Sequence, residues 1–407
     1  MQINLDQILF QRAMPVLQKI ESHGYEAYFV GGCVRDSLLG LSIHDIDIAS
    51  SAKPEEIETI FSRTVDLGKE HGTIIVMQGD TPYEVTTFRT EGDYSDYRRP
   101  DSVSFVRNLK EDTLRRDFTV NAMAVNHHGK VIDYHGGLKD IRRETIRAVS
   151  DPQARFNEDP LRMVRAVRFA SQLDFDLDEH TYQALKDQAH LLENISIERV
   201  RIELTKYLMG PYFYHKYTLL TDSGLSKWMN LPQLGLEEAM EKLGHDMARY
   251  CREGKTIKDV WVWSLFCFHL GLDPQESRKL VKEWTFSNQF ADDLSTLVEL
   301  LHKERADLNQ LKTVYSYPLD LIKEVTSYYS FQGYLFMPSI DQVYMSLSIH
   351  SRQDIALKGQ DIIKLLDLSK GGPIVGQIIE DIEDKIIEGS LLNQEKEISK
   401  YILDHYS

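Results

Sequence analysis

The residues best suited to catalysis lie in one short stretch, VGGCVRDSLLGLSIHDIDIAS, at positions 30–50. Asp45 and Asp47 are separated by a single residue, and in a strand residues at that spacing point to the same face. Two carboxylates so close repel each other unless a cation lies between them, and a divalent metal ion is the usual solution. The glycines Gly31 and Gly32 bring backbone N–H groups toward a helix N-terminus, where phosphate is favoured. This combination predicts a phosphoryl-transfer site.

A third carboxylate that could join this pair is Glu84, near the start of the β-prone run from Tyr83 to Arg89. We expect that run to pair near the strand that carries the two aspartates, which would bring three acidic side chains together. A glutamate exposed on a strand is the alternative interpretation, and the spacing alone is compatible with both.

Two groups of arginines could bind the phosphates of a nucleotide. In the first group, the segment from Leu109 to Asn121 is predicted to begin as a helix and brings Arg115, Arg116 and Asp117 together. Guanidinium groups suit triphosphate oxygens because they stay charged and donate forked hydrogen bonds. A solvated basic helix end is the alternative.

The second group lies on a helix that is predicted to have Asp159 as its N-cap and Pro160 as its first residue. Arg162, Arg165 and Arg168 follow at intervals of three residues and therefore share one broad side of that helix. Such a side could receive a nucleotide, or it could be a solvated face of ion pairs.

The elements that would position these residues change in kind along the chain. Up to about residue 147, helical segments alternate with β-prone runs at 25–30, 44–49, 72–78, 83–89, 122–126 and 130–134. The turn residues from Gly79 to Pro82 predict a hairpin between the third and fourth runs. An amphipathic helix is expected before Gly24, and helices dominate after residue 147. The sequence thus predicts an α+β fold, in which a mixed sheet with helices is followed by an all-α part.

The composition restricts the classes of function. A chain of 407 residues, 42% apolar and 27% charged, is long enough for two or more globular units. Its net charge of −16 argues against a protein held to nucleic acid by overall positive charge. Residues 89–168 nevertheless contain 16 Lys and Arg against 13 Asp and Glu, a local charge of +3, so a polyanion could dock there.

The sequence also bears on the compartment. The longest apolar run, from Val260 to Leu272, is too short and too interrupted to span a bilayer, and no signal-peptide pattern is present. Three scattered cysteines, Cys33, Cys251 and Cys267, argue against a disulfide framework and against a thiolate metal site. We therefore expect a cytoplasmic protein that does not contact a membrane.

Taken together, the motifs resemble those of class II tRNA nucleotidyltransferases, the CCA-adding enzymes, and of the related bacterial poly(A) polymerases. GGCVRDSLLG followed by HDIDIA resembles their nucleotidyltransferase signature, and RRDFTVNAMA, YHGGLKDI and EDPLRMVRAVRFA resemble three further motifs in the same order. This ordered set covers roughly residues 25 to 172. The segment from Gly359 to Asn393 also resembles the tail of the bacterial CCA-adding group, whereas residues 210–350 match only loosely.

The resemblance implies a head of polymerase-β-like nucleotidyltransferase fold followed by a helical neck, body and tail. On this basis we expect the catalytic head at residues 1–147, a neck that selects the nucleotide base at 148–210, a helical body at 211–300 and a tRNA-binding tail at 301–407.

The resemblance also implies a role for each matching residue. Asp45 and Asp47 would hold two Mg²⁺ ions, and Glu84 would complete the catalytic carboxylates. Eight residues would bind the incoming ATP or CTP: Gly32, Arg35 and Arg116 at the triphosphate, Asp117 at the ribose, Asp159 and Arg162 at the base, and Arg165 and Arg168 in support.

The implied reaction is the stepwise addition of CCA to the 3′ end of tRNA from CTP and ATP, without a nucleic-acid template and with release of pyrophosphate. The segment from Glu91 to Pro100, which is expected to form a mobile loop, matches the position of a family loop that enzymes adding only CC are said to lack. The alternatives are a tRNA nucleotidyltransferase that adds only CC or only A, a poly(A) polymerase, and a non-enzymatic RNA-binding protein that kept the fold. Poly(A) polymerases typically have a strongly basic C-terminus, unlike NQEKEISKYILDHYS here. A homodimer is compatible with the sequence.

Overall fold

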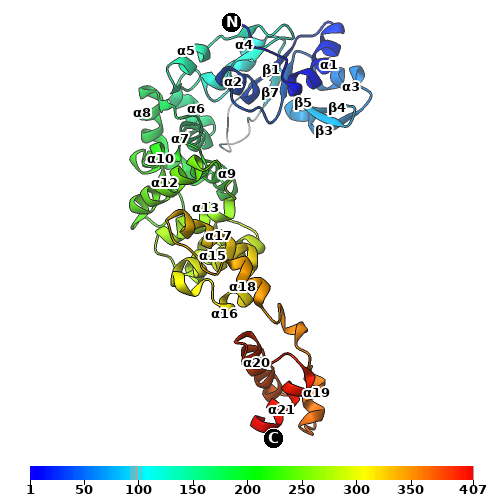
Figure 1. Ribbon diagram of the computed structural model, residues 1–407. Coiled ribbons are helices and arrows are strands. Elements are labelled where there is room, and N and C mark those ends of the chain that lie inside the picture. Colours follow the sequence, from blue (N-terminus) through cyan, green and yellow to red (C-terminus); the bar gives the residue numbers. More distant parts are fainter. Residues whose placement is uncertain (93, 95–96, 98–99, 101, 407) are drawn as a thin grey trace. The chain divides into compact units, whose positions relative to one another are not determined.

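The computed structural model describes residues 1–92, 94, 97, 100 and 102–406, and the chain divides into two compact units (Figure 1). Unit 1 comprises Met1–Ile257 and unit 2 comprises Lys258–Ser407. All residues predicted for the site lie in unit 1. The boundaries that we expect for head, neck, body and tail are finer than this division and stay predictions.

A seven-stranded mixed sheet with the strand order β3-β4-β5-β2-β1-β8-β9 forms the centre of unit 1. Its strands are β1 (Ala27–Val30), β2 (Asp47–Ser50), β3 (Thr64–Gly68), β4 (Thr73–Gln78), β5 (Thr81–Thr87), β8 (Ala124–Val125) and β9 (Val131–Ile132). β2 and β5 are parallel, and the other neighbouring pairs are antiparallel. The predicted hairpin is confirmed as β4 and β5. Two smaller sheets pair β6 (Arg89–Glu91) with β7 (Val103–Phe105) and β10 (Thr145–Ile146) with β11 (Asp176–Leu177).

Helices flank this sheet and form the rest of unit 1. They are α1 (Ile8–Ser22), α2 (Gly32–Leu39), α3 (Pro54–Ile60), α4 (Leu109–Leu114), α5 (Gly137–Arg142), α6 (Pro152–Glu158), α7 (Leu161–Leu173), α8 (Glu179–Gln188), α9 (Ile197–Leu208), α10 (Phe213–Lys216), α11 (Leu219–Asp222) and α12 (Leu236–Arg252). The strands end with β11, so the predicted change from mixed to helical structure is present in the chain.

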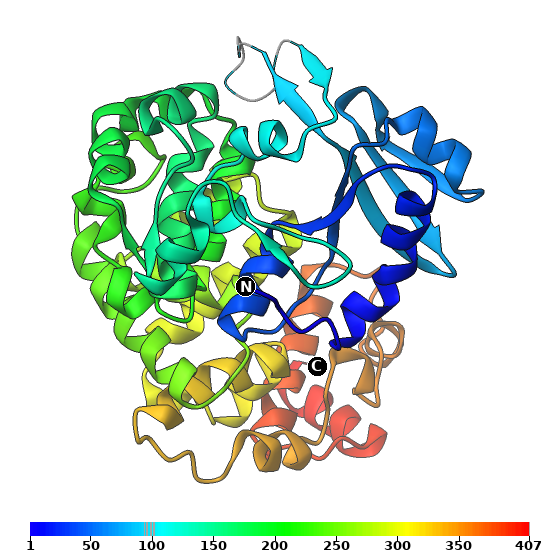
Figure 2. The ribbon, with the colours of Figure 1, turned by 90° about the horizontal axis from the view of Figure 1, so that it is seen from above.

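The first helix shows why these elements form. Five apolar residues of α1 recur at helical spacing and are buried, namely Phe10, Ala13, Val16, Leu17 and Ile20. They join the core that also holds the inward side chains of the sheet, and α1 lies alongside β1 and β4 (Figure 2). The sheet is thereby held on one face, and the strand ends that carry the acidic residues are fixed in place.

Unit 2 is helical throughout its described part. Its helices are α13 (Asp259–His269), α14 (Pro274–Glu283), α15 (Asn288–His302), α16 (Leu311–Ser316), α17 (Leu319–Phe331), α18 (Ile340–Ser346), α19 (Gly359–Leu365), α20 (Pro373–Ile387) and α21 (Glu395–Tyr406). Its core is aromatic, since the Trp263 ring lies 5.5 Å from that of Trp284 and 5.1 Å from that of Phe286. Among the residues described, none of the helices is long and apolar enough to cross a membrane.

The α+β prediction is confirmed, but β1, β2, β8 and β9 are shorter than the β-prone runs that predicted them, and β2 matters most for the site. β2 begins at Asp47, so Asp45 precedes the strand and the argument that both aspartates share a strand face was wrong. The reason lies in the neighbouring strand. β1 ends at Val30, opposite Asp47, and the chain then turns at Gly31 into α2, which leaves residues 44–46 without a partner on that side.

Candidate active site

The acidic end of the candidate site is built from three adjacent strands. Asp47 at the start of β2 is paired with Val30 of β1 on one side and with Glu84 of β5 on the other. The turn at Gly31 has a positive φ of 75°, and a Cβ there would lie 3.4 Å from the Asp47 Oδ2 atom. Glycine adopts this φ without strain and so permits the turn, whereas a Cβ would meet the carboxylate oxygen at ordinary van der Waals distance.

The charge around Asp47 indicates what this end of the site can bind. Asp47 is open to the solvent, yet the surrounding protein removes part of its hydration. This desolvation is the largest cause that raises the pKa of Asp47, the negative charges of Asp45 and Glu84 add to it, Arg116 opposes them, and together they bring the pKa to about 6. Carboxylates that crowd one another in this way fit a hard divalent cation such as Mg²⁺. The described part of the chain contains no group of three or more His, Cys, Asp or Glu side chains placed to hold a metal ion. A Mg²⁺ ion at this end of the site would therefore have Asp45 and Asp47 as its protein ligands.

A cleft of about 590 Å³ extends from these aspartates to α7 and α9. Ten of the eleven residues predicted for the site line it: Gly32, Arg35, Asp45, Asp47, Arg116, Asp117, Asp159, Arg162, Arg165 and Arg168. Glu84 does not line the cleft and reaches the site only through its pairing with Asp47. The structure therefore brings together residues that are more than 130 positions apart in the sequence.

The five arginines predicted for the site each have a carboxylate partner. The ion pairs are Arg35–Asp36 at 2.8 Å, Arg116–Asp112 at 3.3 Å, Arg162–Glu158 at 3.0 Å, Arg165–Asp117 at 2.5 Å and Arg168–Glu203 at 3.1 Å. Pairing offsets part of the cost of desolvating these guanidinium groups, although burial still lowers the pKa of Arg116 and of Arg168. Donor capacity remains, since the buried Nε atom of Arg116 donates no hydrogen bond within the described residues.

The tightest of these pairs joins the end of α4 to α7. Nε and Nη2 of Arg165 donate to Asp117 Oδ2 at 3.0 and 2.5 Å, and the backbone N–H of Phe118 donates to Asp117 Oδ1 at 2.7 Å. Burial raises the pKa of Asp117, but Arg165 and these hydrogen bonds outweigh it and bring the pKa to about 2. Asp117 is therefore an ionised acceptor at neutral pH.

Replacing Asp117 with asparagine is expected to lower the free energy of unfolding by about 2 kcal/mol at neutral pH. The folded pKa of about 2 lies below the ordinary 3.8, so the stabilisation is fully present above about pH 4 and is lost as the pH falls toward 2. Urea unfolding at several pH values measures it. The difference from the wild type should shrink below about pH 4, and a difference that does not change with pH would contradict the assignment. Asp80→Asn, at an exposed turn, is the control.

The two residues predicted to face the base lie where α6 meets α7. Asp159 is the C-cap of α6, and α7 begins at Leu161, so Asp159 is not the N-cap before Pro160 that we expected. Its Oδ1 atom still accepts from the N–H of Leu161 at 3.1 Å, and its Oδ2 atom accepts from Arg199 at 2.8 Å. Pro160 already has helical backbone angles, φ −55° and ψ −22°, and is the N-cap of α7.

Arg162 is held in a similar way. Its Nη1 atom donates to Glu158 at 3.0 Å and its Nη2 atom donates to the carbonyl oxygen of Arg115 at 3.0 Å. A carboxylate has about four acceptor positions and a guanidinium has five N–H groups, so both Asp159 and Arg162 keep capacity for a ligand. Their own orientation is set by the protein before any ligand arrives.

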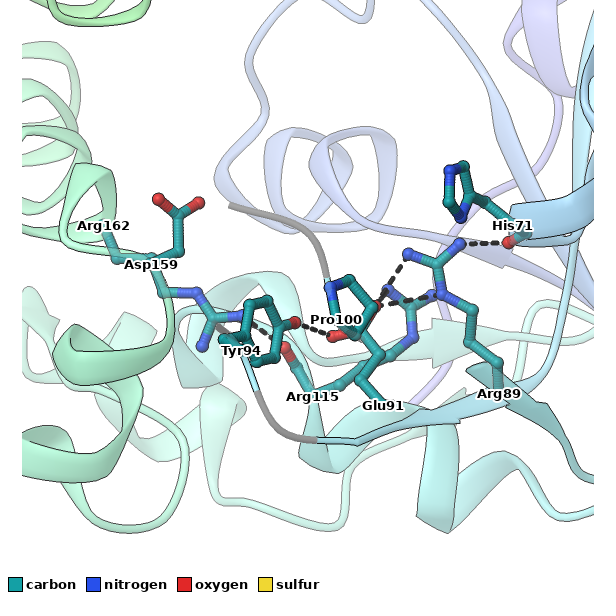
Figure 3. A pocket seen from close by; sticks show the side chains of 8 residues that line it. All are labelled: His71, Arg89, Glu91, Tyr94, Pro100, Arg115, Asp159 and Arg162. Carbon is teal, nitrogen blue, oxygen red and sulfur yellow. Dashed lines mark hydrogen bonds and ion pairs between the residues drawn. The ribbon is translucent and has the colours of Figure 1, made fainter. Parts of the chain in front are cut away.

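A second, smaller cavity of about 320 Å³ shares Asp159 and Arg162 with the main cleft. On its other side Arg89, Arg115 and Tyr94 converge on the carboxylate of Glu91, as Figure 3 shows for the bonds from Arg89 and Tyr94. The loop predicted between Glu91 and Pro100 begins here, but its residues 93, 95, 96, 98 and 99 lie outside the described part of the chain.

Four residues around the cleft were not predicted, namely Asn121, Phe169, Arg199 and Glu203. Asn121 accepts from Arg35 at 2.7 Å and donates to Asp117 at 3.1 Å, and Phe169 lines the cleft beside three arginines. Arg199 and Glu203 lie one turn apart on α9 and pair with residues of α6 and α7 more than 30 positions away. Only their i, i+4 spacing was visible in the sequence, and that spacing does not identify a partner on another helix.

Comparisons with known proteins agree with this arrangement. Residues 27–147 match a family model described as the poly A polymerase head domain, residues 174–235 match a probable RNA and SrmB-binding site of polymerase A, and residues 256–402 match a putative domain 2 of tRNA nucleotidyltransferase. The chain is 43% identical to a CCA-adding enzyme of Streptococcus sanguinis, with 97% of each chain covered. It is 40% identical to one of Enterococcus faecalis, covering 95% and 94% of the two chains. A crystal structure of the Bacillus stearothermophilus CCA-adding enzyme in complex with CTP superposes with a TM-score of 0.88, at 34% identity and with 98% of each chain covered.

Proposed function

Because the chain belongs to the bacterial CCA-adding enzymes of the tRNA nucleotidyltransferase and poly(A) polymerase family, we propose that it completes tRNA 3′ ends in the cytoplasm. It adds CCA to tRNA one nucleotide at a time from CTP and ATP, without a nucleic-acid template. A poly(A) polymerase is the weaker candidate, since the match to domain 2 of tRNA nucleotidyltransferase covers residues 256–402.

One observation carries the proposal: a single cleft is lined at one end by Asp45 and Asp47 and elsewhere by Asp159 and Arg162. The first pair suits the divalent cation that a reacting phosphate needs, and the second pair offers an acceptor and a donor to a base. A site for phosphoryl transfer alone would need only the first pair. The combination supports an enzyme that chooses its nucleotide by protein side chains.

The residues of the cleft divide the work of nucleotidyl transfer. Asp45 and Asp47 would hold Mg²⁺, with Glu84 beside them, and the bound metal supplies Lewis-acid chemistry to the attacking 3′-hydroxyl and the departing pyrophosphate. Arg35, Arg116 and the backbone at Gly32 would bind the triphosphate oxygens and keep the α-phosphorus in line with the tRNA 3′ end. Asp117 would accept a hydrogen bond from the ribose. None of these steps needs a covalent intermediate with the protein.

Base selection would follow from the fixed orientation of Asp159 and Arg162. Cytosine and adenine each present an exocyclic amino group next to a ring nitrogen that is an acceptor. Asp159 can accept a hydrogen bond from the amino group, and Arg162 can donate one to the ring nitrogen. Uracil and guanine present a carbonyl oxygen where the amino group is needed. That oxygen would face the Asp159 carboxylate without a hydrogen bond, which costs about 1–3 kcal/mol.

Removal of divalent cations is expected to abolish incorporation. Dialysis against EDTA should lower CMP and AMP transfer to the detection limit. Without a divalent cation, the negative charges of Asp45 and Asp47 would repel the triphosphate. Added Mg²⁺ should restore the rate, whereas added Na⁺ at equal ionic strength serves as the control. Full activity in EDTA would contradict the roles assigned to the two aspartates.

The function itself is tested with single nucleotides and three tRNA substrates. With CTP alone, a tRNA that lacks CCA should gain two residues. With ATP alone, a tRNA that ends in CC should gain one residue, and a tRNA that ends in CCA should gain none. Repeated AMP addition to any of the three would favour the poly(A) polymerase, and a lack of incorporation would favour a non-enzymatic RNA-binding protein.

A further inference from the structure

We propose that Phe169 is a positioning residue whose ring holds the guanidinium groups of Arg35, Arg165 and Arg168 as one set directed at the nucleotide triphosphate. Phe169 lies on α7, is only 4% exposed and lines the main cleft. The inference rests on the proposed function, because it takes a triphosphate as the ligand of these arginines. The side chain of Phe169 has neither charge nor hydrogen-bonding groups, yet on this proposal it contributes to nucleotide affinity.

The distances place all three cations within reach of one ring. The Cζ atoms of Arg168, Arg35 and Arg165 lie 4.0, 5.0 and 5.4 Å from the centroid of the Phe169 ring. The π-system of a phenyl ring attracts a guanidinium within about 6 Å of its centroid. Like charges that would otherwise push one another apart are therefore drawn toward a common neutral group.

A neutral ring does something that a further carboxylate could not do. Asp36, Asp117 and Glu203 already pair with these arginines, and a fourth negative charge would cancel the positive potential that a triphosphate needs. An aromatic ring orders the guanidinium groups and leaves their charge in place. The ring is thus suited to a site that has to stay attractive to a polyanion.

The ring also couples two elements that approach the nucleotide from different parts of unit 1. Arg35 comes from α2, next to the glycine turn, whereas Phe169, Arg165 and Arg168 come from α7. Asn121 joins the same elements by hydrogen bonds to Arg35 and Asp117. These bonds link Arg35 to the segment that carries Asp117, while the ring lies close to all three guanidinium groups.

Phe118 keeps the Phe169 ring in this orientation. The two ring centroids are 5.8 Å apart with an interplanar angle of 81°, and Phe118 is fully buried. An edge-to-face contact of this kind is a favoured geometry for aromatic pairs. The matched control is therefore Phe156 of α6, which is fully buried in the same unit and, among the described residues, has no cation recorded over its ring.

The test is graded fluorination of Phe169 in the full-length protein. Mono-, di- and trifluorophenylalanine weaken the negative face of the ring stepwise and change its shape little, so the fold is expected to persist and is checked by thermal melting. The Kd for CTP, measured by calorimetry, should rise at each step and reach about tenfold for the trifluoro variant. The KM for CTP and for ATP should rise together while kcat stays constant, because the arginines bind the triphosphate before and during the reaction.

The same series at Phe156 should leave the Kd for CTP unchanged, because that ring does not lie under the arginines. A Kd that stays constant across the Phe169 series, in a protein that binds CTP, would overturn the positioning role, and so would a fall in kcat at constant KM, which indicates loss of folded enzyme. Phe169→Leu gives a second readout, with a rise in KM of about tenfold expected and rescue by Phe169→Tyr. If the wild type binds no CTP at all, the proposed function fails rather than the role of Phe169.

Discussion

Replacing Asp47 with alanine is expected to lower the rate of CMP and AMP incorporation at least about 10³-fold. Asp47 lies between Val30 and Glu84 in the sheet and is the residue on which the charges of Asp45 and Glu84 converge. Without its carboxylate the site loses one of the two ligands assigned to Mg²⁺. The remaining ligand would be Asp45, which lies outside the strand. Single-turnover incorporation of labelled CMP into a tRNA without CCA measures the effect.

The loss of activity should not come from unfolding. The pKa of Asp47 is raised to about 6 in the folded protein, above its ordinary 3.8, so the ionised carboxylate costs stability at neutral pH. Removing that charge should leave the thermal melting temperature of the metal-free protein unchanged or higher. Asp80→Ala, at the exposed turn between β4 and β5, should retain full activity. Residual activity of Asp47→Ala above about a tenth of wild type would contradict its role.

Replacing Arg162 with alanine is expected to reduce the preference for CTP over UTP by about 10- to 100-fold. The guanidinium is oriented by Glu158 and by the carbonyl oxygen of Arg115, and it would donate to the base as one half of the selecting pair. In the variant, cytosine loses the hydrogen bond from Arg162, whereas uracil loses nothing because its ring N–H cannot accept that bond. The affinity for CTP therefore falls toward that for UTP. The ratio of kcat/KM for CTP to that for UTP measures the change.

The tRNA affinity of Arg162→Ala should stay close to that of the wild type, because the side chain is assigned to the nucleotide. Arg142→Ala, at an exposed position of α5, removes an arginine from the same unit and should change neither quantity. An unchanged CTP to UTP ratio in Arg162→Ala would refute the selecting role. A large loss of tRNA binding would assign Arg162 to the RNA instead.

The sequence predicted much of the mixed part of the fold because its signals are local. The apolar spacing of α1, the glycine turn after β1 and the turn residues between β4 and β5 each determine structure within a few positions, and each is present. Asp45 shows the limit of this kind of argument. Its alternation with Asp47 suggested one longer strand, but the length of β2 is set by where its neighbour β1 ends, which is a tertiary property.

In the candidate site, too, the sequence predicted the features that depend on local spacing and missed those that depend on packing. Arg162, Arg165 and Arg168 share one side of a helix by spacing alone, and all three line the cleft. Glu158, which pairs with Arg162, is only four residues away, but the partners of Arg165 and Arg168 come from distant segments, since Glu203 reaches Arg168 only because α9 packs against α7. Ion pairs and ring contacts between distant segments depend on packing, so no local pattern predicts them.

The most direct test of the central claim supplies CTP and ATP together to a tRNA that lacks CCA and determines the added sequence by mass spectrometry. The proposed function predicts a single product that carries two cytidines followed by one adenosine and does not lengthen with time. A ladder of adenosines that keeps growing, or a tRNA recovered without any addition under Mg²⁺, would contradict it.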